Sequence, residues 1–328
     1  MMGMGGMNKP KVLVTRRWPQ AVEAQMAANF DVDLNSADKP LSQDDFRDAM
    51  TRYDAILPTV TDKLQAAVFE TSPRTKILAN YGVGFAHIDT QAAKDRGIAV
   101  TNTPDVLSEC TADIAMTLLL MVARRAGEGE RELREGRWTG WRPTHLIGTK
   151  VSGATLGIIG FGRIGQAMAQ RAHFGFGMKI VVQNRSPVPE EVLNRYNATQ
   201  VPTIEDLLPQ ADFVSLHCPG GAANRHLINA RRLDLMKPSA FLINTARGEV
   251  IDEHALAQSL WFGTIAGAGL DVFEREPQVP DALLNADNLV LLPHLGSATR
   301  ETREAMGFRV LDNLTAFFDG QEPRDRVA

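Results

Sequence analysis

The chain of 328 residues contains only two cysteines, Cys110 and Cys218. Two cysteines in apolar or motif-like surroundings do not make a disulfide framework, so a reducing, cytoplasmic location is expected. The sequence has no apolar run long enough to span a membrane, and its Gly/Met-rich start (residues 1–7) lacks the pattern of a signal peptide. A net charge of -4 gives no general attraction to nucleic acid or anionic membrane. These shortages argue against a secreted disulfide scaffold, a membrane protein and a nucleic-acid-binding protein.

The composition is that of an ordinary globular protein, with 44% hydrophobic and 23% charged residues, and the length suffices for two cores. Strand-like runs alternate with helix-like stretches over the first hundred residues. The strands are expected at 11–15, 55–59, 76–80 and 98–102, with a weaker one at 30–34, and the helices at 19–29, 41–50, 62–70 and 90–96. This alternation predicts a parallel, doubly wound α/β sheet with right-handed crossovers.

A glycine-rich motif follows the next apolar run. Residues 155–159 are expected to form a buried strand, and Gly160, Gly162 and Gly165 follow it with the spacing G-x-G-x-x-G before a helix. The first glycine permits a tight turn, the second lets a pyrophosphate approach the backbone, and the third lets helix and strand pack closely. The helix N-terminus then favours the phosphates. The motif predicts dinucleotide binding, and the alternative is a turn that merely packs tightly.

The second strand of this region, residues 179–183, predicts which dinucleotide is bound. In NAD-binding proteins an acidic residue at its end holds the ribose 2′-hydroxyl. Here Asn184, Arg185 and Ser186 follow, and no acid appears before Glu190. A guanidinium and a hydroxyl suit a 2′-phosphate, which a carboxylate would repel. We therefore predict NADP(H) preference, with NAD(H) as the alternative if Asn184 binds the ribose and Arg185 only stacks on adenine.

Later strands deliver polar residues at their carboxyl ends, the edge where ligands bind in open α/β sheets. These strands are expected at 212–216, 240–244, 265–270 and 289–292. Arg247, Glu276 and His294 follow three of them. A guanidinium can hold a substrate carboxylate in two hydrogen bonds, an imidazolium can give a proton to a ketone oxygen, and a nearby carboxylate favours the charged imidazole. The alternatives are a structural Glu276–Arg247 ion pair and a capping role for His294.

Two further features concern binding and assembly. The glycines at 82 and 84 predict either a loop that presents backbone N–H groups to an anion or an ordinary turn, and the spacing does not decide between them. Residues 108–125 read as an apolar helix buried between domains or between subunits. The charged stretch 124–137 is expected to be solvated. Trp138 and Trp141 lie in a polar loop that serves either as a packing anchor or as a subunit-interface arm.

Four segments together resemble the D-isomer-specific 2-hydroxyacid dehydrogenase family. They are Gly160–Gly165, Asn244–Asp252, Gly269–Pro277 and Pro293–Ser297, and the arm Gly136–Pro143 resembles that of the glyoxylate/hydroxypyruvate reductases and glycerate dehydrogenases. The resemblance implies two doubly wound parallel-sheet (Rossmann/flavodoxin-like) domains with a cleft between them. It implies a substrate domain of residues 1–103 plus 299–328 and a dinucleotide domain of residues 104–298. It also implies a homodimer.

The resemblance also implies roles for individual residues. Arg247 would bind the substrate, and His294 would act as the acid/base with Glu276 as its partner. The backbone at Val83 and Gly84 would bind the carboxylate, loops near Leu57 and Tyr81 would shape the pocket, and Trp141 would approach the neighbouring subunit's pocket. The cofactor would be lined by Gly160, Gly162, Arg163, Ile164, Gly165, Asn184, Arg185, Ser186, His217, Pro219, Thr245, Ala246, Asp271 and Gly296. No metal site is predicted.

These observations predict an NADPH-dependent reductase that converts glyoxylate or hydroxypyruvate to the D-2-hydroxy acid. Formate dehydrogenases of the family have Gln in place of Glu276, which argues against that activity. An oxidation of D-glycerate, D-lactate or phosphite remains an alternative, because phosphite dehydrogenase shares the Arg, Glu and His. A second alternative is a non-enzymatic NAD(H)-sensing module that resembles certain transcriptional corepressors.

Overall fold

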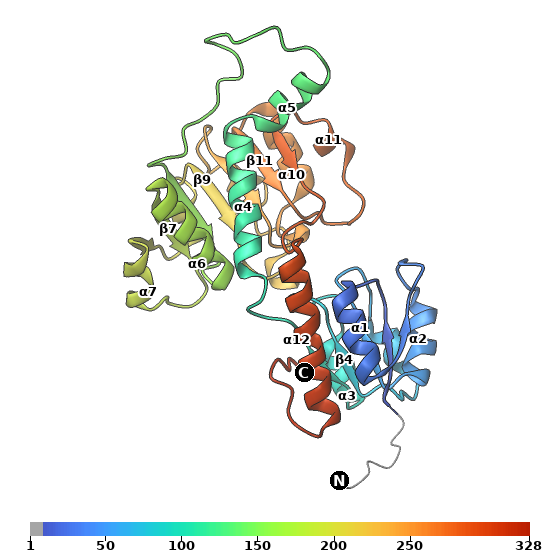
Figure 1. Cartoon of the computed structure of the whole chain (residues 1–328). Coiled ribbons are helices and arrows are strands. Elements are labelled where there is room, and N and C mark those ends of the chain that lie inside the picture. The colour runs from blue at the N-terminus through green and yellow to red at the C-terminus, as the bar shows by residue number, and fades with distance from the viewer. Residues whose placement is uncertain (1–8) are drawn as a thin grey trace. The chain divides into compact units, whose positions relative to one another are not determined.

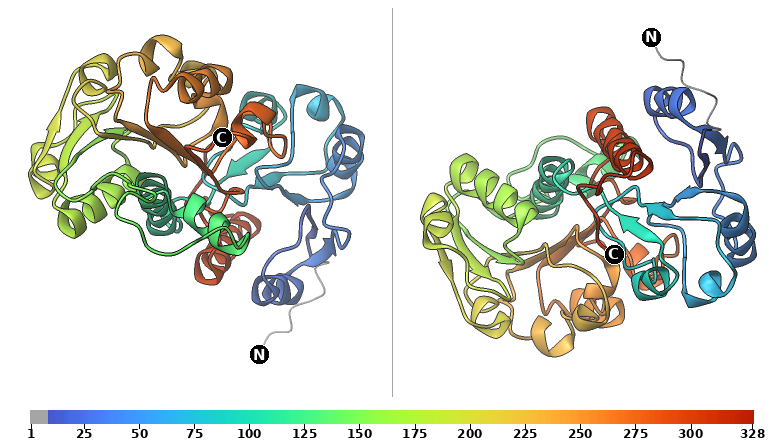
Figure 2. Two further views of the ribbon diagram at one scale, coloured as in Figure 1. Left: turned by 90° about the horizontal axis from the view of Figure 1, so that it is seen from above. Right: turned by 90° about the horizontal axis from the view of Figure 1, so that it is seen from below.

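The computed structural model describes residues 9–328, so the prediction about the Gly/Met-rich start lies outside the described residues (Figure 1). The chain divides into two compact units. Unit 1 joins the N-terminal part up to Leu107 with Thr299–Ala328, and unit 2 is Ser108–Ala298. Each unit is built on a sheet whose strands are all parallel, with helices on both of its faces (Figure 2). The predicted fold class, two doubly wound α/β sheets, is confirmed.

The sheet of unit 1 has five strands in the order β2-β1-β3-β4-β5. The strands are β1 (Lys11–Val14), β2 (Asp31–Leu34), β3 (Ala55–Leu57), β4 (Ile77–Ala79) and β5 (Ala99–Thr101), and the helices are α1 (Gln20–Asn29), α2 (Gln43–Arg52), α3 (Thr90–Asp95) and α12 (Arg300–Phe318). Because side chains alternate along a strand, Val12 and Val14 pack with α1 and α12, whereas Leu13 packs on the other face with α2. The final helix thus completes the core of the N-terminal sheet.

One predicted helix of unit 1 is wrong in its first half. The helix expected at 62–70 is only a short 3₁₀ segment, η1 (Ala66–Glu70), and residues 59–62 form a turn. The carboxyl group of Asp62 accepts a hydrogen bond from the N–H of Thr59 and is hydrogen-bonded to the hydroxyl of Thr15. Such a side chain offers the backbone a turn in place of a helix.

The sheet of unit 2 has seven strands in the order β12-β11-β10-β9-β6-β7-β8. The strands are β6 (Thr155–Ile159), β7 (Lys179–Gln183), β8 (Ala198–Gln200), β9 (Phe213–Leu216), β10 (Phe241–Asn244), β11 (Gly267–Leu270) and β12 (Leu289–Leu291). The helices and short helical segments are α4 (Ser108–Ala123), α5 (Ala126–Arg134), α6 (Arg163–Gln170), η2 (Arg171–Gly175), α7 (Glu190–Arg195), α8 (Ile204–Leu207), η3 (Ala222–Asn224), α9 (Ala230–Leu233), η4 (Gly248–Val250), α10 (Glu253–Phe262) and α11 (Asp281–Leu284). The strand order reverses between β6 and β9, which marks the crevice where such sheets bind ligands.

Helix α4 packs on the sheet of its own unit, and the prediction that it is buried between domains or between subunits stays a prediction. Leu118 and Leu119 are fully buried, and a Cβ placed at Gly269 on β11 would lie 2.9 Å from the Cβ of Leu118. The charged stretch that follows forms α5, a helix that contains no buried residue, as the predicted solvation requires. The chain then runs as an extended loop away from the sheet before it enters β6 (Figure 1). Across residues 9–328, every helix falls short of the length and apolarity that a bilayer crossing demands.

Candidate active site

The glycine-rich turn of unit 2 has the geometry that a dinucleotide requires. Gly160 has a φ of +91°, and a Cβ at this position would lie 2.6 Å from the backbone nitrogen of Cys218. A Cβ at Gly165 would lie 2.3 Å from the carbonyl oxygen of Gly160, whereas none of the described residues comes within 4 Å of a Cβ at Gly162. Helix α6 begins at Arg163, and no side chain of the described residues caps it. Its N-terminus therefore fits a phosphate group.

The segment at the end of β7 is tied to this turn. The side chain of Asn184 accepts a hydrogen bond from the backbone N–H of Phe161 at 3.1 Å and donates one to the carbonyl of Ser186 at 3.0 Å. Arg185 and Ser186 are exposed beside it. The Asn184 amide is thus used in hydrogen bonds within the protein, whereas the Arg185 guanidinium and the Ser186 hydroxyl lie at the surface.

Two buried polar atoms lie where β9 and β10 end. The Nε2 atom of His217 lies 2.8 Å from the hydroxyl of Ser215, and burial lowers the pKa of His217 to about 4, so the ring is neutral at pH 7. The Nδ1 atom of His217 and the hydroxyl of Thr245 are buried without a hydrogen-bond partner among residues 9–328. Buried polar groups are normally satisfied. These two atoms therefore fit a polar ligand along the same edge, where the exposed Pro219 and the half-buried Ala246 also lie.

Arg247 follows β10, and close backbone packing fixes its loop. A Cβ on Gly248 would lie 1.9 Å from the carbonyl carbon of Phe273, so the Arg247 loop rests directly on the segment that leads to Glu276. The Nη1 atom of Arg247 donates to the carbonyl of Ala246 at 2.6 Å. Burial lowers the pKa of Arg247, and the charges of Glu249 and Glu276 oppose this shift. The guanidinium stays protonated in a protein and offers a fixed cation.

Glu276 and His294 form a hydrogen-bonded pair. The Oε2 atom of Glu276 lies 2.8 Å from Nδ1 of His294, and Oε1 accepts from the backbone N–H of Phe273 at 3.1 Å. Burial alone would raise the pKa of Glu276, but the hydrogen bond and charge of His294 outweigh it and lower the pKa. About 30% of each side chain is exposed, 31% for His294 and 29% for Glu276. A carboxylate that fixes one imidazole nitrogen leaves the other for a reacting group.

Asp271 holds the loop that carries His294. Its two carboxylate oxygens accept from the backbone N–H groups of Leu295, at 2.6 Å, and Gly296, at 2.7 Å. The N–H of His294 donates to the carbonyl of Asp271 at 2.9 Å, and His294 has a φ of +57°, which is rare for a residue with a side chain. Burial raises the pKa of Asp271, and the two N–H donors oppose that rise. The predicted contact of Asp271 with a cofactor stays a prediction.

Sequence reasoning missed a polar network behind these residues. Glu253 is buried and accepts from the N–H of Glu274 at 2.8 Å. The Glu274 carboxylate in turn binds Arg225 and lies 3.4 Å from Nε2 of His226. The network joins the loops after β9 and β11 to the start of α10. An acidic residue in the first turn of a helix is common, so the sequence around Glu253 carried no signal of this role.

The predicted substrate residues of unit 1 lie at the end of β3 and in the segment after β4. The carbonyls of Val83 and Gly84 accept from the side chains of Asn102, at 2.8 Å, and Asn80, at 3.0 Å. Within residues 9–328 no hydrogen bond uses the N–H groups of Val83 or Gly84, as an anion-binding loop requires. The Tyr81 ring is buried, and its hydroxyl donates to the carbonyl of Arg303 at 2.6 Å.

Two predicted pocket residues have surroundings of a different kind. Leu57 is fully buried in the core of unit 1, so its side chain packs among apolar neighbours. Trp141 is 82% exposed on the extended loop of unit 2. Their predicted roles stay predictions. Within residues 9–328, no group of three or more His, Cys, Asp or Glu side chains is placed to hold a metal ion.

Comparison with protein families and known proteins places these features among relatives. The family model described as "D-isomer specific 2-hydroxyacid dehydrogenase, NAD binding domain" matches residues 116–296. A glyoxylate reductase of Thermococcus onnurineus is 44% identical over 319 residues, which covers 96% of this chain and 95% of that protein. A glyoxylate reductase of Pyrococcus horikoshii is 45% identical, with 96% of this chain and 95% of that protein covered.

Two solved structures extend the likeness to the whole fold. The crystal structure of a glyoxylate reductase from Paecilomyes thermophila has a TM-score of 0.87 at 32% identity, covering 98% of this chain and 99% of that chain. An NADPH-dependent glyoxylate/hydroxypyruvate reductase from Sinorhizobium meliloti, in complex with NADP and malonate, has a TM-score of 0.85 at 38% identity. That match covers 98% of this chain and 97% of the other.

Proposed function

This chain belongs to the D-isomer specific 2-hydroxyacid dehydrogenase family and is an oxidoreductase, and from that premise we propose that it reduces glyoxylate and hydroxypyruvate with NADPH. The product from hydroxypyruvate is the D-2-hydroxy acid, and the product from glyoxylate is achiral. The observation that carries the proposal is the hydrogen bond between Glu276 and His294, together with the close packing of the segment before Glu276 on the Arg247 loop. The relatives named as glyoxylate reductases support the substrate class.

In the proposed reaction, each charged residue acts on one part of the substrate. Arg247 binds the carboxylate of the 2-keto acid, and its positive charge also polarises the ketone. His294 enters the reaction as an imidazolium and gives the proton on Nε2 to the ketone oxygen, since Nδ1 faces Glu276. Glu276 stabilises the charged ring and holds its orientation. A dinucleotide held at the glycine turn would supply a hydride, and with the proton from His294 this would balance the reduction of the carbonyl to an alcohol.

The cofactor we propose is NADPH, with NADH as the weaker alternative. The glycine turn at 160–165 and the start of α6 would hold the pyrophosphate, and Arg185 with Ser186 would hold the 2′-phosphate. The exposure of both side chains beside the anchored Asn184 supports this assignment. A structural relative that is described as NADPH-dependent and contains NADP also supports it.

The remaining predicted contacts complete the proposal. The N–H groups of Val83 and Gly84 bind the substrate carboxylate together with Arg247, and residues near Leu57 and Tyr81 bound the pocket. The enzyme works as a cytoplasmic homodimer in which the exposed Trp141 reaches the neighbouring subunit. The exposure of Trp141 on an extended loop supports an interface role, because aromatic residues are enriched at subunit contacts.

A spectrophotometric assay tests the function. Purified protein is given NADPH or NADH with glyoxylate, hydroxypyruvate, pyruvate and phenylpyruvate, and the configuration of each product is determined. We expect the highest kcat/KM with NADPH and glyoxylate or hydroxypyruvate, and D products where the product is chiral. Faster NADP-dependent oxidation of D-glycerate, D-lactate or phosphite would show that the proposed direction of the reaction or the proposed substrate is wrong. Dinucleotide binding without turnover of any of these compounds would point instead to a nucleotide-sensing module.

A further inference from the structure

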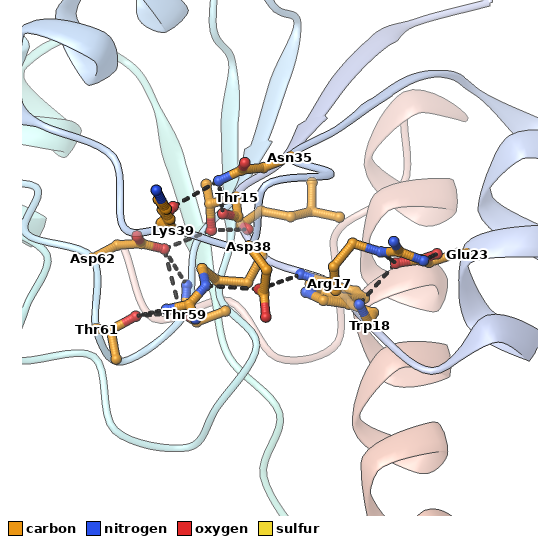
Figure 3. Close-up of polar contacts among 12 residues, drawn as sticks. Thr15, Arg17, Trp18, Glu23, Asn35, Asp38, Lys39, Thr59, Thr61 and Asp62 are labelled. Carbon is orange, nitrogen blue, oxygen red and sulfur yellow. Dashed lines mark hydrogen bonds and ion pairs between the residues drawn. The ribbon is translucent and has the colours of Figure 1, made fainter.

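Unit 1 contains a buried carboxyl group that the proposed reaction does not use. Asp62 is 1% exposed and lies in the turn after β3. Its Oδ2 atom accepts from the N–H of Thr59 at 2.8 Å and lies 2.5 Å from the hydroxyl oxygen of Thr15, at the end of β1 (Figure 3). Its Oδ1 atom is buried and has no hydrogen-bond partner among residues 9–328. The group thus joins the ends of two neighbouring strands.

A count of hydrogen atoms indicates the charge state of this group. The hydroxyl of Thr15 also lies 3.1 Å from the carbonyl oxygen of Leu57. A hydroxyl has one hydrogen to donate, whereas a carbonyl and an ionised carboxylate only accept. If Asp62 were ionised, it would take that hydrogen, and the Leu57 carbonyl would face a lone pair of Thr15 and keep only the long hydrogen bond from the N–H of Thr15, at 3.4 Å. If Asp62 is protonated, it donates to Thr15, and Thr15 donates to Leu57.

The surrounding charges compensate an ionised Asp62 only in part. Arg16 is engaged elsewhere, because its Nε lies 2.9 Å from a carboxylate oxygen of Asp38 and its Nη1 donates to the hydroxyl of Thr61 at 3.1 Å. Lys39 and Lys63 are exposed. Burial raises the pKa of Asp62, and the hydrogen bonds from Thr15 and Thr59 and the charge of Arg16 oppose that rise.

His87, on the loop after β4, is engaged as well, because its ring lies 3.0 Å from the side-chain oxygen of Asn80. The neighbouring Asp89 caps helix α3 through the N–H of Ala92 at 2.9 Å. A buried carboxylate without an ion pair is costly, so the neutral acid is the favoured form.

The position of this group in the sheet gives it a role. The strand order of unit 1 reverses between β1 and β3, and ligands of open α/β sheets bind at the carboxyl ends of the strands at such a point. We propose that Asp62 is a positioning residue, a neutral carboxylic acid that donates to Thr15 and thereby clamps the turn after β3 to the end of β1. Leu57, which the family resemblance places near the substrate, is the residue whose carbonyl this clamp holds.

Thermal unfolding as a function of pH tests the protonation state without using activity. The Asp62→Asn variant keeps a hydrogen donor for Thr15 and cannot ionise. A carboxyl group that stays protonated in the folded state destabilises the fold as pH rises above the unfolded pKa of about 4. We therefore expect the melting temperature of Asp62→Asn to rise relative to wild type between pH 4 and pH 8, by about 3 °C for each unit by which the folded pKa is raised.

Asp38→Asn is the matched control on a neighbouring loop. Hydrogen bonds from the Arg17 N–H and from Arg16 lower the pKa of Asp38, so its charge stabilises the fold above the unfolded pKa. This variant should lose melting temperature relative to wild type as pH rises, the opposite sign to Asp62→Asn. If Asp62→Asn follows the sign of Asp38→Asn, Asp62 is ionised and the proposal is overturned.

Infrared spectra keep the proposal testable if Asp62→Asn does not fold. The wild type should show a protonated-carboxyl band at neutral pH that shifts in Thr15→Val, because the acid loses its acceptor. If Thr15→Val leaves every protonated-carboxyl band unchanged, the hydrogen bond from Asp62 to Thr15 does not exist.

The positioning role rests on the proposed function and has its own measurement. Asp62→Ala should raise the KM for the 2-keto acid about 10-fold or more with a smaller change in kcat, because the substrate loop is misplaced. Asp62→Asn should recover part of this loss in KM, since its amide can donate to Thr15 but its nitrogen cannot also accept from the N–H of Thr59. An unchanged KM in Asp62→Ala overturns the positioning role. Failure of the proposed reaction itself would appear as inactive wild-type protein, and the pH-dependent melting would still report the state of Asp62.

Discussion

His294 and Glu276 are separated by 18 positions in the sequence, yet Nδ1 of the imidazole lies 2.8 Å from Oε2 of the carboxylate. The carboxylate is fixed from its other side as well, because its Oε1 accepts from the N–H of Phe273. The imidazole is fixed through its backbone, which is bonded to Asp271. The relationship therefore defines which imidazole nitrogen faces the protein and which remains for a substrate.

Replacement of Glu276 by Gln should slow reduction. A neutral amide no longer stabilises the charged imidazole of His294, so kcat at pH 7.5 should fall about 10-fold. Initial rates at saturating substrate give kcat. A Glu276→Gln kcat equal to that of wild type would rule out the carboxylate as partner of the acid.

The stability of the same variant has a defined sign. Because the pKa of Glu276 is lowered in the folded state, its contribution is present above the unfolded pKa and is lost as pH falls through the folded pKa. Glu276→Gln should therefore unfold at a lower temperature than wild type at pH 7, and this difference should shrink below about pH 4. A difference that grows in acid contradicts the lowered pKa.

His294→Gln should remove the proton donor while keeping a side chain of similar size. We expect kcat for 2-keto acid reduction to fall about 10²-fold or more, the size of a lost general acid. Binding of the dinucleotide, measured by fluorescence titration, should stay unchanged. His254→Gln, an exposed histidine on α10, is the control and should retain wild-type kcat. Full activity of His294→Gln would refute the assignment.

The sequence predicted the site where chemistry and periodicity act locally. The turn Gly160–Gly165 between strand and helix follows from its three glycines. At Gly160 and Gly165 a Cβ would collide with backbone atoms, so no other residue fits at these two positions. Arg247, Glu276 and His294 could be predicted as site residues because parallel strands end at a common edge, so residues far apart in the chain are brought to one side of the sheet.

Other features depend on contacts that a pattern does not encode. Glu253 reads as an ordinary acid in the first turn of a helix, and only the fold brings it to the N–H of Glu274. Strand β8 was missed because an edge strand with partly exposed residues lacks an apolar run. The helix expected from residue 62 was wrong because Asp62 bonds the backbone locally, a choice that the amino-acid composition of the segment does not reveal.

Arg247 should be essential for binding the substrate carboxylate. Arg247→Ala should raise KM for the 2-keto acid steeply and lower kcat/KM about 10³-fold, because a ground-state contact and a transition-state charge are both lost. Arg247→Lys should recover only part of this loss, since an ammonium cannot make the paired hydrogen bonds of a guanidinium. Steady-state kinetics with glyoxylate give both parameters. If Arg247→Ala changed kcat/KM less than about 5-fold, the carboxylate would have to bind elsewhere.

Arg185 should determine which dinucleotide is used. Arg185→Asp replaces a cation by a carboxylate that repels a 2′-phosphate and accepts from a ribose hydroxyl, so the ratio of kcat/KM for NADPH over NADH should fall at least about 10²-fold. Arg195→Asp, in the last turn of α7, changes the charge of the same unit by the same amount and serves as the control. The preference for NADPH fails if wild-type protein uses NADH equally well or better.

Gly248 joins the Arg247 loop to the segment before Glu276, and its replacement should affect both stability and activity. In Gly248→Ala the new Cβ would lie 1.9 Å from the carbonyl carbon of Phe273 and 2.2 Å from the backbone nitrogen of Glu274. These are backbone atoms, which cannot rotate away as the end of a side chain can, so the two loops must move apart. We expect a loss of about 3 kcal/mol or more in the free energy of unfolding, measured in urea, and a fall in kcat because Arg247 and Glu276 are displaced. Gly175→Ala is the matched control, since none of the described residues lies within 4 Å of its Cβ, and its unfolding free energy should change by less than about 1 kcal/mol. A Gly248→Ala variant with the stability and kcat of wild type would show that the two loops do not need this contact, and the coupling between the cation and the acid pair would have to arise elsewhere.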